Sequence, residues 1–532
     1  MSARVLSATG SAAAIATPHR AATDAGAAAF ADGGNAIDAA LAAAVTLAVV
    51  YPQQCGVGGD LFALVAEPGG AVNAVNASGP APRALDPRQV RAMHRAMPEF
   101  GPLSVTVPGA VAGWSALHGL GAALPWTELF APAVGWAREG VSTVRSMAAR
   151  LEAAGERLSS DPGMAQVFYP RGRPLVEGEP FVQPVLADTL EAIAEAGAAA
   201  MYGGAMGDRL AAGLQALGSP MSSEDLASFS PERTPPLTSP YRGLEVAVVP
   251  PNSPGFALLE MLAVVERLGI DPDPLGPDAA LLAAVFEAAS ADRDRHNADP
   301  RVAAVPVDEL LADEHLDRLC HAARGATGPS SAGPATPARH RDGGDTVALV
   351  AADGEGRLVS LVQSLWSSFG SGLLEPSTGI ILHNRGNDFT LDPSSPNVLA
   401  GGKRPAHTLT PVLVRREGRP VGASGSRGGG GQPQINYMNL VRAFDLGMDA
   451  AAAVAAPRYL VGGMDLHAER FADVEARVPN QVRDALASSG FRVDLLADLD
   501  DAVGHAHLVL RDADGSLDIG TDPRADGTAW AR

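Results

Sequence analysis

The chain has 532 residues, of which 46% are hydrophobic and 19% are charged, and its formal net charge is −20. This length exceeds what one ordinary core needs, so we expect one large unit or two closely packed units. The hydrophobic content is too high for a disordered chain. The negative charge argues against nucleic acid and anionic membranes as partners, because their phosphates would be repelled.

The two cysteines, Cys55 and Cys320, are too far apart in the sequence to define a disulfide framework, and we expect two idle thiols in a reducing compartment. The first residues show no charged start followed by an apolar run. The apolar segment 36–51 is short and holds Asp38, which favours a buried helix over a membrane span. These features predict a cytoplasmic protein with no membrane partner.

The first 300 residues alternate between the helical spacing of apolar residues and the strict alternation that indicates strands. Glycine-rich interruptions divide the longer helical runs. The expected elements are two helices within His19–Val50 broken at Gly33–Asn35, a strand at Leu61–Val65, a helix entered at Val107–Trp114, a helical run over Leu186–Leu217 interrupted at Tyr202–Gly204, a helix at Ala257–Leu268 and a helix in FEAASADRDRHNADP.

Residues 322–345 carry almost no large apolar side chains, so we interpret them as a mobile linker that cannot bury enough surface to be ordered. Order returns at Thr346, where TVALVAA and RLVSLVQS alternate around a DGEG turn and predict a β-hairpin. Strands in blocks and helices in blocks favour layered sheets flanked by helices, an α+β fold. Further strands are expected at Gly379–Leu382, Pro411–Arg415 and His507–Arg511, and helices at Asn436–Phe444 and Pro479–Ser489.

The position of Thr346 between the linker and the hairpin allows two interpretations. Strands often begin with threonine, which has a high β-propensity. Alternatively, the chain is cut before Thr346 and the new N-terminus is a catalyst. A threonine hydroxyl is a poor nucleophile without an adjacent base, and a free α-amine, whose ordinary pKa is about 7.7–8.0, would supply that base.

A series of motifs along nearly the whole chain favours the second interpretation. They are HR at His19, GGNAIDAA, GVGGDLF, VPGAVAGW, PPNSPG, ADRDRHNADP, GDT, SLVQSLWSSFGSG, HNRGNDF, KRPAHTLTP, SGSRGGGGQPQ and TDPRADG. In this order the motifs resemble the γ-glutamyltransferase (γ-glutamyl transpeptidase) family of N-terminal-nucleophile hydrolases. Within the family the chain resembles the oxamate amidohydrolase and cephalosporin acylase members.

The resemblance implies a four-layer αββα sandwich made from one precursor. Cleavage between Asp345 and Thr346 would give a large subunit, 1–345, and a small subunit, 346–532, that stay entwined as one structural unit. The sequence carries no nicotinamide, flavin or nucleotide fingerprint, and we expect no metal and no other cofactor. Whether the processed pair forms a higher oligomer is left open.

The resemblance also implies roles for residues of the small subunit. Thr346 corresponds to the nucleophile, and Ser364 to a hydroxyl that bonds and stabilises it. Gly428 and Gly429 correspond to the pair whose backbone N–H groups form the oxyanion hole. The rival interpretation of this glycine run, a phosphate loop, lacks the GK[ST] ending that such loops carry.

The predicted substrate pocket departs from the pattern of γ-glutamyl enzymes. Asp388 is kept, but Arg385 stands at the Gln position, Trp366 at the Asn position, and His407–Thr408 at the Ser pair. Ser78 occupies the place of the usual carboxylate-binding Arg, with Arg83 nearby in sequence. Because Arg prefers carboxylates, our hypothesis is that Arg385 binds an anion. The alternative is that Arg385 only pairs with Asp388.

These observations predict a self-processing amide hydrolase or acyltransferase that forms an acyl-threonine and acts on a γ-glutamyl compound or another small acidic amide. Hydrolysis of an oxamate-like amide, or cleavage of a C–C bond, is the alternative within the fold, and a non-catalytic binding protein is the alternative of another class. His505 and His507 are a poor metal pair, because no carboxylate or thiol cluster accompanies them. Asp292, Arg293 and Arg295 predict a charged helix face, and Arg524 and Asp526 structural pairing.

Overall fold

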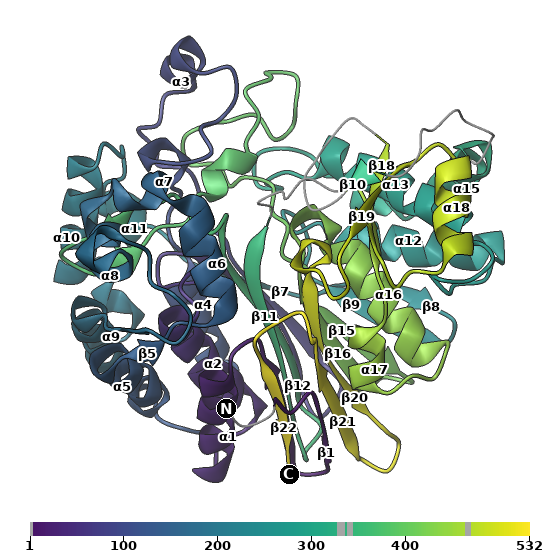
Figure 1. The fold of residues 1–532 in the computed structure, drawn as a ribbon, viewed down its shortest axis with the longest axis horizontal. Helices are drawn as coiled ribbons and strands as arrows, with labels where there is room; N and C mark the ends of the chain where they lie inside the picture. Colours follow the sequence, from purple (N-terminus) through teal and green to yellow (C-terminus); the bar gives the residue numbers. More distant parts are fainter. Residues whose placement is uncertain (1–3, 327–335, 338–343, 463–469) are drawn as a thin grey trace.

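Two seven-stranded antiparallel sheets form the centre of the molecule (Figure 1). The computed structural model describes residues 4–326, 336–337, 344–462 and 470–532. The first sheet has the order β22 (Thr528–Ala531), β2 (Ala13–Thr17), β11 (Asp345–Asp353), β12 (Leu358–Trp366), β3 (Asp60–Ala66), β4 (Val72–Ala77) and β7 (Glu232–Thr234). The second has the order β1 (Ser7–Gly10), β21 (Leu517–Thr521), β20 (His505–Arg511), β16 (Arg419–Arg427), β15 (Val412–Arg416), β9 (Leu244–Val248) and β8 (Leu237–Tyr241).

The two sheets pack face to face through small and branched apolar side chains. Alternate residues of β11, including Ala348 and Val350, meet residues of β15 and β16 such as Leu413 and Ala423 in one buried cluster. A Cβ on Gly425 would lie 3.0 Å from the Cβ of Ala348, so the sheets approach closely there. Because β11 is buried along its full length, its sequence is a near-continuous apolar run, as expected for a strand covered on both faces.

Helices cover the outer face of each sheet, on the left and right of Figure 1. The core outside the first sheet includes α1 (Arg20–Ala31), α2 (Ala36–Val50), α4 (Ala110–His118), α5 (Ala131–Glu139) and α9 (Pro184–Ala196). The core outside the second sheet includes α12 (Gly255–Leu268), α13 (Ala279–His296), α15 (Asp313–Ala326) and α16 (Gln432–Phe444).

Helix α2 shows why the apolar segment 36–51 is a core helix. All its residues are buried, and Asp38 completes a capping box with Asn35 at its start. Asp38 also accepts hydrogen bonds from the backbone N–H groups of Ala123 and Leu124. The buried carboxylate is therefore fully engaged by backbone donors, which offsets the cost of its desolvation.

The remaining elements surround these layers. A smaller sheet consists of β10 (Thr336–Pro337), β19 (Arg492–Leu496), β18 (Phe471–Glu475) and β17 (Tyr459–Val461), and two short pairs are β13 (Leu374–Glu375) with β14 (Ile380–Ile381) and β5 (Val141–Ser142) with β6 (Pro180–Phe181). The other helices are α3 (Pro87–Met93), α6 (Arg145–Ala154), α7 (Glu156–Ser159), α8 (Pro162–Phe168), α10 (Ala205–Ala216), α11 (Ser223–Ala227), α14 (Val307–Leu310), α17 (Ala450–Ala455) and α18 (Asn480–Ser488).

The expected elements are present, with two differences. The helical run predicted over Leu186–Leu217 is interrupted before the expected Tyr202–Gly204. Helix α9 ends at Ala196, and the next residue, Gly197, has a φ of +70° that does not continue the helix. The predicted linker 322–345 was wrong at its start, since α15 continues to Ala326. Leu316, Leu319, Cys320 and Ala323 form a buried stripe at helical spacing that holds this end of α15 in place. Residues 327–335 and 338–343 of the linker lie outside the described residues.

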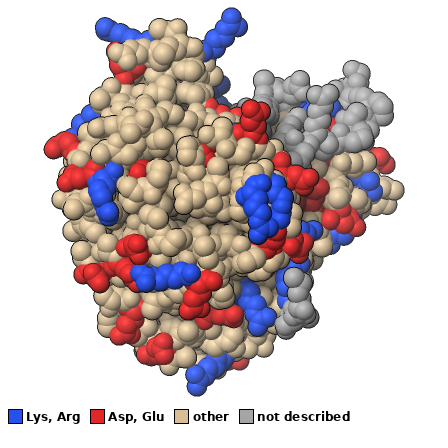
Figure 2. All heavy atoms as spheres, turned by 60° about the vertical axis from the view of Figure 1, so that its left-hand side comes forward, with Lys and Arg blue, Asp and Glu red and all other residues tan. Residues whose placement is uncertain are grey.

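Cys55 and Cys320 are both free, buried thiols. Among the helices of the described residues, none combines the length and the apolar character needed to cross a bilayer. On the face shown in Figure 2, acidic and basic side chains are scattered, and Lys and Arg do not gather into one patch.

Candidate active site

Thr346 lies at the second residue of β11, in the middle of the first sheet, and its side chain is fully buried. Its partner across the sheet is Ser364 on β12, whereas Asp345 pairs with Trp366. The register therefore shifts at the Asp345–Thr346 bond, where β12 contains one extra residue, Leu365. Bulges of this kind occur next to active sites, where they re-aim a side chain.

The hydroxyl of Ser364 connects the hydroxyl of Thr346 to the carbonyl of Asp345. Thr346 Oγ1 donates to Ser364 Oγ at 2.9 Å, and Ser364 Oγ donates to the Asp345 carbonyl oxygen at 2.8 Å. Ser364 Oγ also accepts from the backbone N–H of Trp366 at 2.8 Å. One donated and two accepted bonds use the full capacity of a serine hydroxyl, so Ser364 is fixed between the two groups.

The glycine pair Gly428–Gly429 follows β16 and lies beside the residue that precedes Asp345. A Cβ added to Gly344 would come within 2.5 Å of the backbone N and Cα of Gly429. Both glycines of this contact have positive φ values, +60° at Gly344 and +49° at Gly429, a region that residues with a Cβ rarely adopt. The predicted oxyanion-hole residues and the predicted scissile bond are therefore neighbours.

Asp345 is held by a group of charged side chains that the sequence analysis missed. Its carboxylate accepts hydrogen bonds from Arg427, and Arg150 lies 3.7 Å away. Both arginines also contact Asp501. Arg427 directly precedes the glycine run, which is the one sequence signal that could have pointed to it. Arg150 and Asp501 lie far from each other in the chain, so no local pattern connects them.

The residues predicted to bind substrate meet around Arg385, in the short 3-10 helix η5 (Arg385–Asp388). Its Nη1 donates to Asp388 at 2.7 Å and to Thr408 Oγ1 at 3.3 Å. The guanidinium lies 4.3 Å from the centre of the Trp366 ring, a cation–π contact. Arg385 is buried, and its Nε and Nη2 have no hydrogen-bond acceptor among the described residues.

Trp366 reaches Arg385 through an unusual backbone conformation. Its φ is +79°, in the left-handed region, which is a genuine outlier for a bulky residue. Strained residues of this kind cluster at functional sites, where the surrounding structure holds them. Here the hydrogen bond from Trp366 N–H to Ser364 holds the strained residue, so Trp366 connects the predicted nucleophile with the predicted anion-binding group.

The family model described as gamma-glutamyltranspeptidase matches residues 22–531. The chain belongs to the γ-glutamyltranspeptidase family. It is 36% identical over 522 residues to the oxamate amidohydrolase proenzyme of Klebsiella pneumoniae, covering 96% of this chain and 97% of that protein. It is 35% identical to the glutathione hydrolase-like YwrD proenzyme of Bacillus subtilis, with 97% of each chain covered. The crystal structure of cephalosporin acylase from Bacillus halodurans matches with a TM-score of 0.90 and 33% identity, covering 100% of this chain and 98% of that chain.

These relatives confirm the predicted family and the prediction of an enzyme, since their names are those of hydrolases and acylases. The mixed helix and sheet architecture resembles that of the cephalosporin acylase.

His407, which the sequence predicts to be a substrate-binding residue, has both ring nitrogens engaged among the described residues. Its Nε2 lies 3.1 Å from the carboxylate of Asp60, and its Nδ1 accepts the backbone N–H groups of Thr408 and Leu409. Burial, together with the charge of Arg385, lowers the pKa of His407 to about 3. His407 is therefore a neutral residue whose ring nitrogens are both engaged within the protein, and its direct contact with substrate stays a prediction.

Asp60 is the anionic centre of this supporting layer. Burial alone would raise its pKa, but the neighbouring His383 and His407, at 3.3 and 3.1 Å, outweigh burial and lower the pKa below its ordinary value. The ionised carboxylate fixes the orientation of the His407 ring, and thereby the backbone that carries Thr408.

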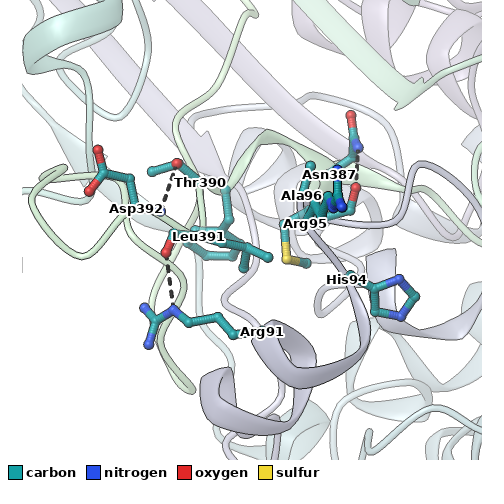
Figure 3. Close-up of a pocket in the computed structure, with 10 residues that line it drawn as sticks. Arg91, His94, Arg95, Ala96, Asn387, Thr390, Leu391 and Asp392 are labelled. Carbon is teal, nitrogen blue, oxygen red and sulfur yellow. Dashed lines mark hydrogen bonds between the residues drawn. The ribbon is translucent and has the colours of Figure 1, made fainter.

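A pocket of about 690 Å³ lies beside the candidate active site, between α3 and the loop after η5 (Figure 3). Arg91, Arg95 and Asp392 contribute to its wall. Asn387 also lines it and accepts a 3.5 Å hydrogen bond from the indole of Trp366. Thr346 does not line this pocket, so the pocket flanks the predicted substrate residues and does not contain the predicted nucleophile.

The other charged residues singled out in the sequence have structural contacts. Asp292 and Arg293 are buried, which differs from a charged helix face, and Arg293 donates to the carbonyl of Gly430 in the glycine run. Arg295 is exposed.

The C-terminal motif makes structural contacts. Arg524 pairs with Glu475 and Asp522, and Asp526 accepts a hydrogen bond from the hydroxyl of Tyr51. Arg83 is exposed and bonds Ser228, and Ser78 is buried against Asn252.

Buried neutral histidines predict that acid destabilises the protein. Burial lowers the pKa of His507 to about 3, well below the ordinary 6.5, so between these values the unfolded chain binds the proton and the folded chain does not. Stability is therefore complete above pH 6.5 and is lost as the pH falls below it. In His507→Asn the amide keeps the bond that His507 Nδ1 makes to Thr521 but cannot titrate. Between pH 7 and 5 we expect this variant to lose about 1–2 kcal/mol less unfolding free energy than the wild type, measured by denaturant titration. Equal losses in both proteins would contradict the prediction.

Proposed function

We propose that this chain is a self-processing amide hydrolase that uses Thr346 as its nucleophile and acts on a small acidic amide. The observation that carries the proposal is the hydrogen-bond chain from the Thr346 hydroxyl through Ser364 to the Asp345 carbonyl. It joins a nucleophile, a proton carrier and an electrophile in one line. The proenzyme names of the oxamate amidohydrolase and YwrD relatives support processing of a single precursor.

The first reaction is cleavage of the chain's own backbone. Thr346 Oγ1 adds to the carbonyl carbon of Asp345, its proton passes to Ser364, and Ser364 gives its own proton to the carbonyl oxygen. The C–N bond then breaks, the nitrogen takes a proton to become the free α-amine of Thr346, and Asp345 is left as an ester on Oγ1. Water hydrolyses the ester, which regenerates the threonine hydroxyl and gives Asp345 an α-carboxylate.

The strand order supports two subunits that stay entwined after this cut. In the first sheet, β11 and β12 of the 346–532 piece lie between β2 and β3 of the 1–345 piece, and β22 pairs with β2 on its other side. Separating the pieces would break both ladders of the central strands. The two facing sheets with helices outside them likewise support the proposed four-layer αββα sandwich.

In substrate turnover, the α-amine of Thr346 would act as the general base for its own hydroxyl. The acyl group of the amide is transferred to Oγ1, the amine leaves with a proton, and water or an acceptor amine releases the acyl group. The backbone N–H groups of Gly428 and Gly429 would stabilise the oxyanion that forms at each step.

The hydrogen-bonding state of Arg385 favours a substrate that carries a carboxylate. Two of its donors have no acceptor among the described residues, although the side chain is buried, and a carboxylate would satisfy both in a bidentate contact. Asp388, which would bind an ammonium group in a γ-glutamyl enzyme, is already paired with Arg385. Both features favour an oxamate-like amide over a γ-glutamyl compound.

The Thr346→Ala variant is expected to remain one chain of 54.3 kDa on denaturing electrophoresis, because no hydroxyl remains at the bond, whereas the wild type gives two bands. Thr346→Ser should still be cut, since it keeps the hydroxyl. Cleavage of the Ala variant, or an intact wild-type chain in active material, would refute the mechanism.

Ser364→Ala is expected to slow self-cleavage about 10²–10³-fold, the usual cost of removing one donor to a developing oxyanion. Ser364→Thr is the matched control, because it restores a hydroxyl at the same position. The measurement is the rate at which the two fragments appear after purification of the uncut chain. If the Ala variant is cut at the wild-type rate, Ser364 plays no part in the step.

Arg385→Gln, which introduces the side chain typical of γ-glutamyl enzymes, is expected to lower kcat/KM for oxamate about 10–100-fold, through loss of charge-assisted hydrogen bonds. Released ammonia is measured with the processed enzyme. Arg83→Gln, at an exposed arginine on the surface, serves as the control and should leave kcat/KM unchanged. Efficient turnover of glutathione by the wild type, with oxamate ignored, would overturn the assignment of an acidic amide.

A further inference from the structure

Three helices outside the second sheet bring two carboxylates and a histidine together. The residues are Glu260 on α12, Asp292 on α13 and His315 on α15, here named the helix triad. The three helices contact one another on the right of Figure 1. One side-chain atom of each residue that can bind a metal lies within 4.8 Å of the corresponding atoms of the other two. The sequence did not connect these residues, because each comes from a separate helix.

Glu260 has hydrogen-bonding capacity that no described residue satisfies. It is fully buried, and neither of its carboxylate oxygens has a hydrogen-bond partner among the described residues. Its ion pair with His315 Nε2 spans 3.8 Å, which is too long for a hydrogen bond. Burial, together with the charge of Asp292, raises the pKa of Glu260 well above its ordinary value. A buried carboxyl group without a partner is costly in either protonation state, so this position favours a ligand that the protein itself does not supply.

The other two members of the triad point toward the same place. His315 Nε2 lies 2.7 Å from Asp292 Oδ2 and 3.8 Å from Glu260 Oε1. In tetrahedral ligation with bonds of about 2.0–2.2 Å, the ligand atoms lie about 3.4 Å apart, so small side-chain rotations suffice to place the three atoms around one ion. The side chain of His315 is 14% exposed and that of Glu260 0%, so an ion would enter from the side of His315.

We propose that the helix triad binds one divalent transition metal such as Zn²⁺, with water completing the coordination. One imidazole nitrogen and two carboxylate oxygens suit zinc, whereas Mg²⁺ and Ca²⁺ prefer six or more oxygen ligands. The ion would take Nε2 of His315, and the ring proton would move to Nδ1. Arg318 donates to Nδ1 at 3.1 Å, but its side chain is 62% exposed and is free to turn toward solvent.

The metal would cross-link α12, α13 and α15, which gives it a structural role. The residue after Asp292, Arg293, donates to the carbonyl of Gly430 in the glycine run, so the support given to α13 extends to that run. The proposal departs from the expectation of no metal, and it does not rest on the proposed function.

The test measures metal binding by the whole chain, produced without a histidine tag and freed of metal with EDTA. Calorimetric titration with Zn²⁺ is expected to show one site, and Zn²⁺ at ten times its Kd should raise the Tm by about 1–2 °C. Mg²⁺ at the same concentration should do neither. His315→Ala is expected to weaken Zn²⁺ binding by at least about 10-fold, the cost of losing even an outer-shell partner of a metal. His321→Ala, at an exposed histidine of the same helix, is the matched control and should bind as the wild type does.

Glu260→Gln keeps the shape of the side chain, removes its charge and is expected to weaken binding by a similar factor. If that variant does not fold, His315→Ala on the solvent side decides the question, with the visible absorption of bound Co²⁺ as a second readout that this variant should lose. Zn²⁺ binding that is equal in the wild type and His315→Ala would overturn the proposal, and so would a wild type that binds no Zn²⁺. Neither readout depends on turnover, so an uncut or inactive wild type would refute the proposed function and leave this test intact.

Discussion

The hydrogen-bond chain from Thr346 through Ser364 to the Asp345 carbonyl depends on the bulge at the start of β11. In a regular antiparallel ladder, side chains point to alternate faces and backbone carbonyls bond the neighbouring strand. The extra residue on β12 instead brings the Ser364 side chain to the Asp345 carbonyl, so that a hydroxyl takes the place of a ladder donor. Two central strands that are buried almost throughout hold this arrangement in place, which favours the proposed reaction at the Asp345–Thr346 bond.

The same constraint explains the glycines and the strained tryptophan around the site. Gly344 and Gly429 approach so closely that a side chain on Gly344 would meet the backbone of Gly429. Trp366 adopts a positive φ directly after the bulge, with its N–H on Ser364 and its ring against Arg385. The conformation of the bulge therefore determines both where Thr346, the proposed nucleophile, lies and how the guanidinium of Arg385 is oriented. A change at Trp366 would act on both.

The sequence predicted what depends on local pattern. The alternation of apolar and polar residues around a DGEG turn predicted the β11–β12 hairpin. The helical spacing of apolar residues predicted α1, α2 and α12. The family motifs brought Thr346, Ser364, Gly428 and Arg385 into one list of candidates. What the sequence did not predict depends on long-range contacts. Arg150 and Asp501 meet only in the fold, and His407 Nε2 is engaged because Asp60, on the distant strand β3, reaches it. The linker prediction was wrong at 322–326. These residues have few large apolar side chains, but they continue α15, which is held by a narrow stripe of buried residues.

The charges around Thr346 contrast with the composition of the chain. The protein as a whole is strongly acidic, yet the buried groups of the candidate active site include Arg385, Arg427 and Arg150. Each is matched by a carboxylate of the protein, Asp388 for Arg385 and Asp345 with Asp501 for the other two. Buried charges persist only when paired, so these carboxylates maintain the arginines in a folded precursor that has no substrate. Arg385 keeps two donors, Nε and Nη2, that have no acceptor among the described residues, so the anion binding proposed there needs no rearrangement of the protein.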